Sequence, residues 1–355
     1  MRQYHSLKIA SVQQETADSV RIALDVPEEL RDEFRHLPGQ HLPIEAEIGG
    51  KRVRRTYSIC TPPGTWPVQI GIRIQPGGQF SNYAAGLSAD DTLRVMPPFG
   101  QFHPDVTPGD DRSGVAFAAG SGITPIISII AATLAAEPQS RFTLFYANRT
   151  QRSTMFIDDL YGLKNRYPDR LQLVFLFSQE EQEFPVLAGR LERGKVRELM
   201  ERFFAGGRAS EVYVCGPGTM SDEVGEALQE LGIDQAIIHR ERFGTARAGA
   251  RTPAPERGSS DRQTRVTVIM DGHRKAFTMQ SEGVAIVDAA AEQGIDLPYS
   301  CKGGVCATCR THLREGSVRM DTNYGLEPWE LEQGYILACQ SHPESEEITL
   351  DYDRT

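Results

Sequence analysis

The chain has 355 residues, a formal net charge of −10 and six cysteines, which leaves room for two or three domains. Its acidic balance disfavours nucleic acid as a partner. Its longest nearly apolar run, 122–136, contains Pro125 and is shorter than the roughly 20 residues that span a membrane. The N-terminus has neither a signal-peptide nor a transit-peptide pattern, so we expect a cytoplasmic protein without a membrane partner.

The first 109 residues alternate between short apolar-polar strands and turns such as LPGQ and PPGTWP. Regular spacing of this kind is typical of a small antiparallel β-barrel. We therefore predict a barrel domain over 1–109. Its expected strands are 5–12, 19–26, 41–48, 54–60, 68–74 and 92–97.

Two features of this barrel suit a phosphate-bearing ligand. Alternation places Arg55 and Tyr57 on one face of a strand, where a guanidinium can pair with phosphate and a ring can stack on a flavin. An ordinary exposed strand explains the same pair. Farther on, Gly77 and Gly78 open a helix whose free N–H groups, with the Ser81 hydroxyl, suit a pyrophosphate.

The pattern changes over 110–244 to apolar strands that alternate with helices, which predicts a parallel sheet covered by helices. We expect 211–215 to be the last strand of this sheet. The expected strands are 115–120, 142–147, 171–177 and 211–215, and the expected helices are 125–137, 154–165, 191–204 and 220–232.

Dinucleotide-binding signals follow two of these strands. Gly120 and Gly122 allow close backbone approach to a phosphate, with Thr124 as the predicted N-cap of the next helix, although the third glycine of G-x-G-x-x-G is missing. Cys215 and Gly216 lie at the carboxyl end of the 211–215 strand, where open α/β sheets bind ligands. A lone buried cysteine is more often a small apolar residue, so Cys215 gains a role only together with the rest.

The coenzyme preference rests on the loop after the second strand of the sheet. Arg149 and Arg152 place positive charge where the 2′-phosphate of NADPH is bound, whereas an acidic residue there is typical of NADH enzymes. A solvated basic loop explains the same residues.

A segment rich in Ala, Gly, Pro, Ser and Arg, 245–262, predicts a flexible linker before a C-terminal domain at 263–355. In that domain we expect a hairpin turning at Asp271-Gly272, a helix at 284–294 and a final strand at 347–353. The domain holds 8 Lys/Arg and 15 Asp/Glu, a net −7. Such charge suits docking on a basic patch of a partner, and a solvated surface explains it equally.

Four cysteines of this domain have the spacing C-x4-C-x2-C-x29-C. The first three match the plant-type [2Fe-2S] arrangement, in which each tetrahedral iron takes two cysteine sulfurs. Gly303 and Gly304 allow backbone N–H groups to point at sulfur. A zinc site is the alternative, but zinc cysteines usually pair as C-x2-C. The predicted ligands are Cys301, Cys306, Cys309 and Cys339.

Taken in order, Arg-x-Tyr-Ser, Gly-Gly-x-Phe-Ser, Gly-Ser-Gly-Ile-Thr-Pro, Cys-Gly-Pro and Glu-Arg-Phe resemble the ferredoxin–NADP reductase superfamily, here fused to a plant-type ferredoxin. The resemblance covers nearly the whole chain. It implies a multidomain protein with an antiparallel β-barrel FAD domain, an α/β parallel-sheet NADP domain and a C-terminal β-grasp ferredoxin domain.

The resemblance also implies roles for single residues. The expected catalytic residues are Ser58, Cys215 and Glu241. The expected FAD-binding residues are Arg55, Tyr57, Ser58, Gly78, Ser81 and Phe243, with Tyr57 stacked on the flavin and Ser58 near its N5. The expected nicotinamide-nucleotide residues are Gly120, Gly122, Thr124, Arg149, Cys215 and Gly216. Gln179 stands where plant-type members have an arginine near the 2′-phosphate, and FMN in place of FAD is an alternative.

Segments such as YANRT and TNYGLEPWEL are similar, more narrowly, to reductase subunits of aromatic-ring epoxidases. The expected electron route runs from NADPH through FAD and the [2Fe-2S] cluster to a di-iron oxygenase that epoxidises phenylacetyl-CoA. The eight histidines, His36 and His41 among them, show no metal-binding spacing, so we expect them to be ordinary and the oxygen chemistry to lie on the partner. A reductase for another ring-hydroxylating or alkane oxygenase, and a redox sensor without turnover, are the alternatives.

Overall fold

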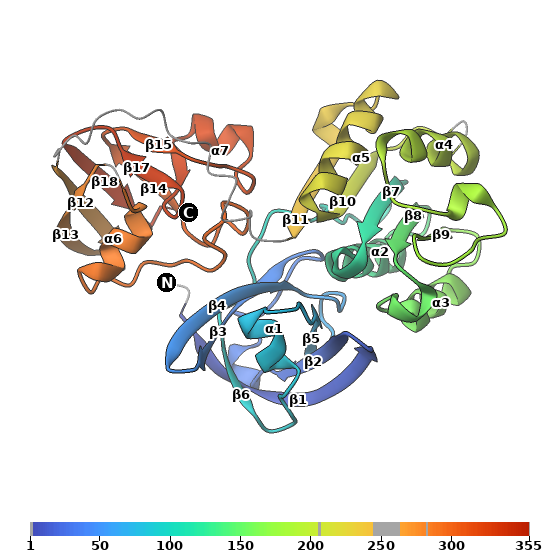
Figure 1. The fold of residues 1–355 in the computed structure, drawn as a ribbon, viewed down its shortest axis with the longest axis horizontal. Helices are drawn as coiled ribbons and strands as arrows, with labels where there is room; N and C mark the ends of the chain where they lie inside the picture. The colour runs from blue at the N-terminus through green and yellow to red at the C-terminus, as the bar shows by residue number, and fades with distance from the viewer. Residues whose placement is uncertain (1–2, 205–206, 244–262, 282, 355) are drawn as a thin grey trace. The chain divides into compact units, whose positions relative to one another are not determined.

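The structure is a computed structural model that describes residues 3–204, 207–243, 263–281 and 283–354 (Figure 1). Residues 4–53 and 57–244 form one compact unit, and the residues from 263 onward belong to a second. The predicted linker, 245–262, lies outside the described residues. None of the described helices combines the length and the apolar character needed to cross a membrane.

The N-terminal half of the first unit is an antiparallel sheet with strand order β4-β3-β6-β1-β2-β5. Its strands are β1 (His5–Thr16), β2 (Ser19–Asp25), β3 (His41–Ile48), β4 (Lys51–Ser58), β5 (Val68–Arg73) and β6 (Thr92–Val95). All six predicted strands are confirmed. The predicted boundary at residue 109 falls between β6 and the next strand and stays a prediction.

Alternation builds the interior of this sheet. In β1, Leu7 and Ile9 are buried while Lys8 between them is exposed, because successive side chains point to opposite faces. Directly after β4, Ile59 forms a bridge with Ile70 of β5, which joins the two outer strands of the order. The sheet therefore closes on itself as the predicted barrel.

The second half of the unit is a parallel sheet with strand order β11-β10-β7-β8-β9. Its strands are β7 (Ser113–Ala119), β8 (Arg141–Asn148), β9 (Leu171–Phe177), β10 (Glu211–Pro217) and β11 (Ile238–Phe243), and its helices are α2 (Ile123–Ala136), α3 (Ile157–Arg166), α4 (Arg193–Phe203) and α5 (Gly218–Glu230). Helices α2 and α3 pack on one face of the sheet, and α4 and α5 on the other (Figure 1).

One prediction about this sheet is wrong. The strand at 211–215 is not the last, because β11 follows it and pairs with β10 in parallel. The segment IHRERF carries several charged or ionisable side chains in a row and lacks the apolar run of a buried strand, so its pattern does not predict an edge strand. This strand brings Glu241 directly beside Cys215.

The barrel and the parallel sheet are joined by polar contacts. Arg21 of β2 donates to Asp159 of α3 at 3.2 Å, and Glu15 of β1 accepts the backbone N–H of Phe156 at 2.7 Å. On α2, the Ser128 hydroxyl donates to the Thr61 carbonyl at 2.7 Å. These contacts explain why the two sheets behave as one compact unit.

The C-terminal unit is a mixed sheet with strand order β13-β12-β18-β14-β16 and a helix, α6 (Ile286–Glu292), packed on it. Strands β12 and β18 are parallel, as expected for a β-grasp domain, and the other pairs are antiparallel. The strands are β12 (Gln263–Met270), β13 (His273–Gln280), β14 (Arg310–Glu315), β16 (Tyr335–Leu337) and β18 (Glu347–Asp351), beside a pair formed by β15 (Val318–Met320) and β17 (Ser341–Pro343).

The predicted turn at Asp271-Gly272 is confirmed, with φ of 55° and 71°. Both residues are left-handed, which is the type I′ geometry that matches strand twist. The elements between the cysteine loop and β18 are short, and the sequence pattern does not predict them. They include β14, β15, β16, β17 and α7 (Pro328–Glu332).

Candidate active site and cluster site

Four side chains from the two sheets of the first unit converge at one point. His41 begins β3 and Ser58 ends β4 in the barrel, while Cys215 of β10 and Glu241 of β11 lie near the carboxyl ends of their strands. His41, Ser58 and Cys215 are 5%, 3% and 0% exposed. The structure therefore brings together all three expected catalytic residues and adds a histidine.

Glu241 is the centre of this group. Its Oε2 accepts from the Ser58 hydroxyl at 3.5 Å and from the Cys215 thiol at 3.9 Å. Its Oε1 lies 3.4 Å from His41 Nδ1. One carboxylate thus ties β3 and β4 of the barrel to β10 and β11 of the parallel sheet.

The histidines were expected to be ordinary surface or hydrogen-bonded residues, and His41 is a buried one that pairs with Glu241. Its backbone exchanges two 2.9 Å hydrogen bonds with Phe99, and a Cβ on Gly100 would lie only 3.1 Å from its ring. Gln40 bonds the Gly100 carbonyl at 3.2 Å. The Nε2 atom of His41 is buried without a hydrogen-bond partner among the described residues. The His41 ring therefore carries one free polar atom. The PGQH turn is the only sequence signal of this arrangement.

The electrostatics of the group keep Cys215 neutral. Burial raises the pKa of the Cys215 thiol well above its usual range, and the adjacent Glu241 charge raises it further. A thiolate nucleophile is therefore not available here. The group offers a hydroxyl and a thiol oriented by one carboxylate.

Close packing connects Cys215 to the glycine-rich turn after β7. A Cβ on Gly122 would lie 2.1 Å from the Cys215 carbonyl oxygen and 2.9 Å from the Gly216 nitrogen, so only glycine fits. Gly120 has φ of 55°, and its carbonyl accepts from the Tyr146 hydroxyl at 2.8 Å. The turn after β7 and the end of β10 are therefore in close contact.

Thr124 is not the N-cap of α2, which is a correction to the prediction. Helix α2 begins at Ile123 with Gly122 as its N-cap, and the Thr124 hydroxyl donates to the Ser121 carbonyl at 2.9 Å. Gly120–Gly122 forms a short 3-10 turn, which moves the helix start back and leaves Thr124 inside the first turn.

Arg149 directly follows β8, and Arg152 lies in the loop after that strand, as predicted. Both side chains are exposed. The backbone N–H of Gln179 donates to the Arg149 carbonyl at 2.8 Å, so the ends of β8 and β9 are adjacent. The Glu180 carboxylate accepts the Gln151 N–H at 2.9 Å. An acidic side chain of the loop after β9 therefore lies beside the loop that carries the two arginines.

The predicted flavin residues of the barrel lie on β4 and around α1 (Gln79–Ala84). Arg55 and Tyr57 alternate on β4, and the Tyr57 ring lies 5.4 Å from the Phe80 ring. Ser81 Oγ accepts the Gln75 N–H at 3.1 Å and would be only 2.5 Å from a Cβ on Gly78. Ser81 thus braces the turn that leads into α1, and Gly78 is required for that close approach.

The four cysteines of the C-terminal unit lie in two pairs. A hydrogen bond from the Cys306 thiol, with the amides of Cys306 and Gly303, lowers the pKa of Cys301 to about 5. The Cys309 thiol lowers the pKa of Cys339 in the same way. The Cys306 N–H lies 3.4 Å from Cys301 Sγ and the Cys301 N–H lies 3.5 Å from Cys306 Sγ, so Cys301 lies beside Cys306. The hydrogen bond between the Cys309 and Cys339 side chains pairs the other two cysteines.

Two cysteines per iron is the arrangement that a [2Fe-2S] cluster needs. Among the described residues, no three cysteines, histidines or carboxylates converge closely enough to hold a single metal ion. One predicted backbone donor is present, since the Gly303 N–H lies 3.3 Å from Cys301 Sγ. The Thr308 hydroxyl, 3.2 Å from Cys306 Sγ, is a further donor that the sequence pattern does not predict. The loop residues thus fit a two-iron cluster, with Gly304 at φ of 73° where a Cβ would meet the Thr322 carbonyl.

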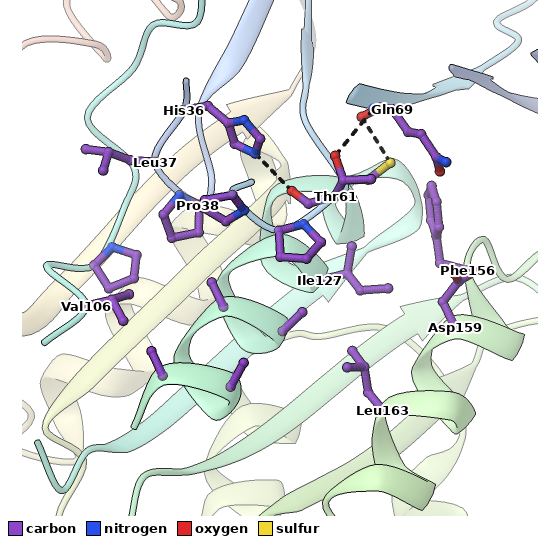
Figure 2. A pocket seen from close by; sticks show the side chains of 18 of the residues that line it. His36, Leu37, Pro38, Thr61, Gln69, Val106, Ile127, Phe156, Asp159 and Leu163 are labelled. Atoms are coloured by element: carbon purple, nitrogen blue, oxygen red, sulfur yellow. Dashed lines mark hydrogen bonds between the residues drawn. The ribbon is translucent and has the colours of Figure 1, made fainter. Parts of the chain in front are cut away.

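A separate cavity of about 960 Å³ lies in the first unit, between barrel loops and helices α2 and α3 (Figure 2). Prolines and alanines are the commonest residues of its walls, and His36 lies 3.1 Å from the Thr61 carbonyl at its edge. None of the predicted site residues that the structure describes lines it. It is therefore distinct from the group around Glu241.

Three family models match successive parts of the chain. Residues 6–103 match an oxidoreductase FAD-binding domain, 117–226 an oxidoreductase NAD-binding domain and 268–344 a 2Fe-2S iron-sulfur cluster binding domain. The expected cofactors FAD, NAD(P) and [2Fe-2S] are thereby confirmed.

Full-length relatives extend the match to nearly the whole chain. The chain is 43% identical to one of the subunits of 1,2-phenylacetyl-CoA epoxidase from Escherichia coli K12, over 99% of both chains. It is 32% identical to the ferredoxin reductase component of 3-ketosteroid-9-alpha-monooxygenase from Rhodococcus rhodochrous, over 98% of this chain and 96% of that protein.

Among solved structures, phthalate dioxygenase reductase, described as a modular structure for electron transfer from pyridine nucleotides to [2Fe-2S], matches the fold with a TM-score of 0.57 at 24% identity, over 98% of both chains. The domain matches, the full-length relatives and the fold all point to the same family. The chain belongs to the NAD(P)H-dependent oxygenase reductases, in which FAD and NAD domains of the ferredoxin–NADP reductase superfamily are joined to a C-terminal [2Fe-2S] domain and carry electrons from NAD(P)H through FAD to the cluster.

Proposed function

We propose that this chain is the NADPH-dependent reductase component of a multicomponent monooxygenase whose di-iron oxygenase epoxidises the aromatic ring of phenylacetyl-CoA. One observation supports this proposal above the others. Identity to the epoxidase protein is 43% over 99% of both chains, against 32% for the ketosteroid monooxygenase reductase.

In this proposal the barrel holds FAD. Arg55 and the turn at Gly78 and Ser81 bind its phosphates, and Tyr57 and Phe243 pack against its ring. Bound FAD supplies the conversion between a two-electron nicotinamide donor and a one-electron cluster. The buried Nε2 of His41, which lacks a partner among the described residues, is a polar atom beside the Glu241 group that a bound cofactor would satisfy.

The chain itself contributes alignment. Gly120 and Gly122 let the dinucleotide backbone approach α2, and Cys215 with Gly216 line the nicotinamide pocket. Glu241 fixes the rotamers of Ser58 and Cys215, and His41 and Ser58 hold the carboxylate from the barrel side. Proximity of two bound partners supplies most of the rate in such a reaction, so these positions govern catalysis without acting as strong acids or bases.

NADPH is the proposed coenzyme because Arg149 and Arg152 are exposed at the carboxyl end of β8, where the adenosine half is bound in open α/β sheets. The nearby Glu180 reduces the positive potential of this loop. The use of a nicotinamide donor and of reduced cysteines at the cluster supports a cytoplasmic location.

Reconstitution tests the partner. The purified chain, NADPH and air are mixed with the oxygenase component of phenylacetyl-CoA epoxidase and its substrate, and in parallel with the oxygenase component of 3-ketosteroid-9-alpha-monooxygenase and a 3-ketosteroid. The proposal predicts ring epoxide in proportion to NADPH oxidised in the first mixture and little product in the second. Product in the second mixture alone would overturn it and favour the steroid system.

A further inference from the structure

Three hydroxyl groups in the C-terminal unit are buried and have no hydrogen-bond partner among the described residues. One belongs to Ser300, beside the cluster ligand Cys301. The other two belong to Thr311 of β14 and to Tyr352, the residue that follows β18. A buried hydroxyl without a partner costs roughly 1–3 kcal/mol. Native proteins keep few such groups, and one beside a cofactor site points to a bond that the cofactor completes.

Strand register places the Thr311 and Tyr352 hydroxyls on the face of the sheet that carries a cluster cysteine. Strands β14 and β18 pair His312 with Asp351 and Leu313 with Leu350, so Tyr352 follows opposite Thr311. Directly opposed residues point to the same face. Cys309 directly precedes β14, and its carbonyl accepts the Ala338 N–H at 3.2 Å beside the Arg310–Leu337 pair. The pairing of β14 with β16 thus continues to Cys309, and alternation gives it the orientation of Thr311. Tyr352 and Cys309 are therefore diagonal neighbours on one face.

The Tyr352 side chain is long enough to reach Cys309 from this position. Diagonal neighbours across an antiparallel pair are about 7–8 Å apart, which an aromatic side chain spans. Burial raises the pKa of the Tyr352 hydroxyl. The group remains a protonated donor.

We propose that Tyr352 donates a hydrogen bond to the Cys309–Cys339 side of the bound cluster and thereby raises its reduction potential. The bond stabilises the reduced cluster more than the oxidised cluster, because reduction adds negative charge to the sulfurs. It complements the bonds from Gly303 and Thr308, which reach Cys301 and Cys306 on the other side. Tyr352 is a positioning residue of the cluster and touches no substrate.

The test uses the full-length holoprotein with Tyr352→Phe, and Tyr335→Phe as a matched control. Tyr335 lies on β16 of the same sheet, is buried, and is opposite His312, so it points to the other face. The midpoint potential of the cluster is measured by redox titration with EPR detection of the reduced state.

We expect Tyr352→Phe to keep the cluster and to lower the ratio of reduced to oxidised cluster at a fixed applied potential about fivefold. For a one-electron couple a tenfold change in this ratio is 59 mV, so the midpoint potential should shift by about −40 mV. Tyr335→Phe should match the wild type. Equal potentials in all three proteins would overturn the proposal.

A second measurement strengthens the hydrogen-bond donor instead of removing it. Incorporating 3-fluorotyrosine makes every tyrosine hydroxyl a stronger donor, so the cluster potential of the labelled wild type should rise, while labelled Tyr352→Phe should show no rise. A rise of equal size in both labelled proteins would show that other tyrosines are responsible and would overturn the assignment to Tyr352.

Discussion

The cluster site and the Glu241 site are built in opposite ways. Three of the four cluster ligands lie within nine residues of one loop, from Cys301 to Cys309. The Glu241 site is assembled from four strands of two sheets, and 200 residues separate its first member, His41, from Glu241.

The contrast shows what each site depends on. Loop conformation alone positions the first three sulfurs, so the cluster site survives as long as that loop and Cys339 are in place. The Glu241 site depends on the packing of the barrel against the parallel sheet, because its carboxylate accepts from residues of both. Damage to one site should leave the other working.

The sharpest separation comes from Cys306→Ser. This change removes a cluster ligand and should abolish electron transfer to the oxygenase, while NADPH oxidation by ferricyanide stays within about twofold of the wild type, because the flavin route does not use the cluster. Cys60→Ser is the control, since Cys60 Sγ donates to the Gln69 carbonyl at 3.2 Å, a bond that serine keeps. Transfer to the oxygenase that persists in Cys306→Ser would refute the separation.

The reverse experiment is Glu241→Gln. The amide keeps the size of the side chain but loses the charge that orients Ser58, Cys215 and His41, so kcat for NADPH–ferricyanide turnover should fall about 10- to 100-fold. The EPR spectrum of the cluster should not change. Glu226→Gln on α5, which removes an exposed carboxylate paired with Arg193, should leave both readouts intact. A wild-type kcat in Glu241→Gln would show that the group is structural.

A smaller effect is expected for Gly122→Ala, which tests the contact between the glycine turn and β10. The new Cβ meets the Cys215 carbonyl, so the chain must shift at a cost of about 1–3 kcal/mol, seen as a lower Tm and a higher KM for NADPH. Gly194→Ala in α4 meets nothing within 4 Å and should stabilise the protein slightly. Equal Tm values for the two variants would contradict this packing.

The smallest expected effect is on coenzyme choice. Arg149→Ala should raise KM for NADPH about tenfold, the loss of one charge-assisted contact, and leave KM for NADH unchanged. Arg141→Ala, exposed at the start of β8, is the control because it lies at the opposite end of the strand. An equal rise for NADH and NADPH would show that Arg149 does not read the 2′-phosphate.

The same contrast explains what the sequence could reveal. The spacing of Cys301, Cys306 and Cys309 is local and specific, so the cluster and the hairpin around Asp271 are predictable from the residues alone. The alternating patterns also predict the six barrel strands and the first four strands of the parallel sheet.

What the sequence pattern misses depends on tertiary contacts. Strand β11 has no apolar pattern because it lies at the edge of the sheet, and the role of His41 appears only when Phe99, Gly100 and Glu241 surround it. The N-cap of α2 differs because a 3-10 turn over Gly120–Gly122 precedes the helix. Each miss is a place where contacts beyond the local pattern decide the outcome.

Anaerobic rapid mixing of the holoprotein with NADPH, with flavin and cluster absorbance followed separately, tests the account most directly. In the wild type, flavin reduction should come first and cluster reduction should follow it. Glu241→Gln should slow both by the same factor, whereas Cys306→Ser should keep the flavin phase and lose the cluster phase. A cluster that is reduced at the wild-type rate in Glu241→Gln would contradict the proposed route through the Glu241 site.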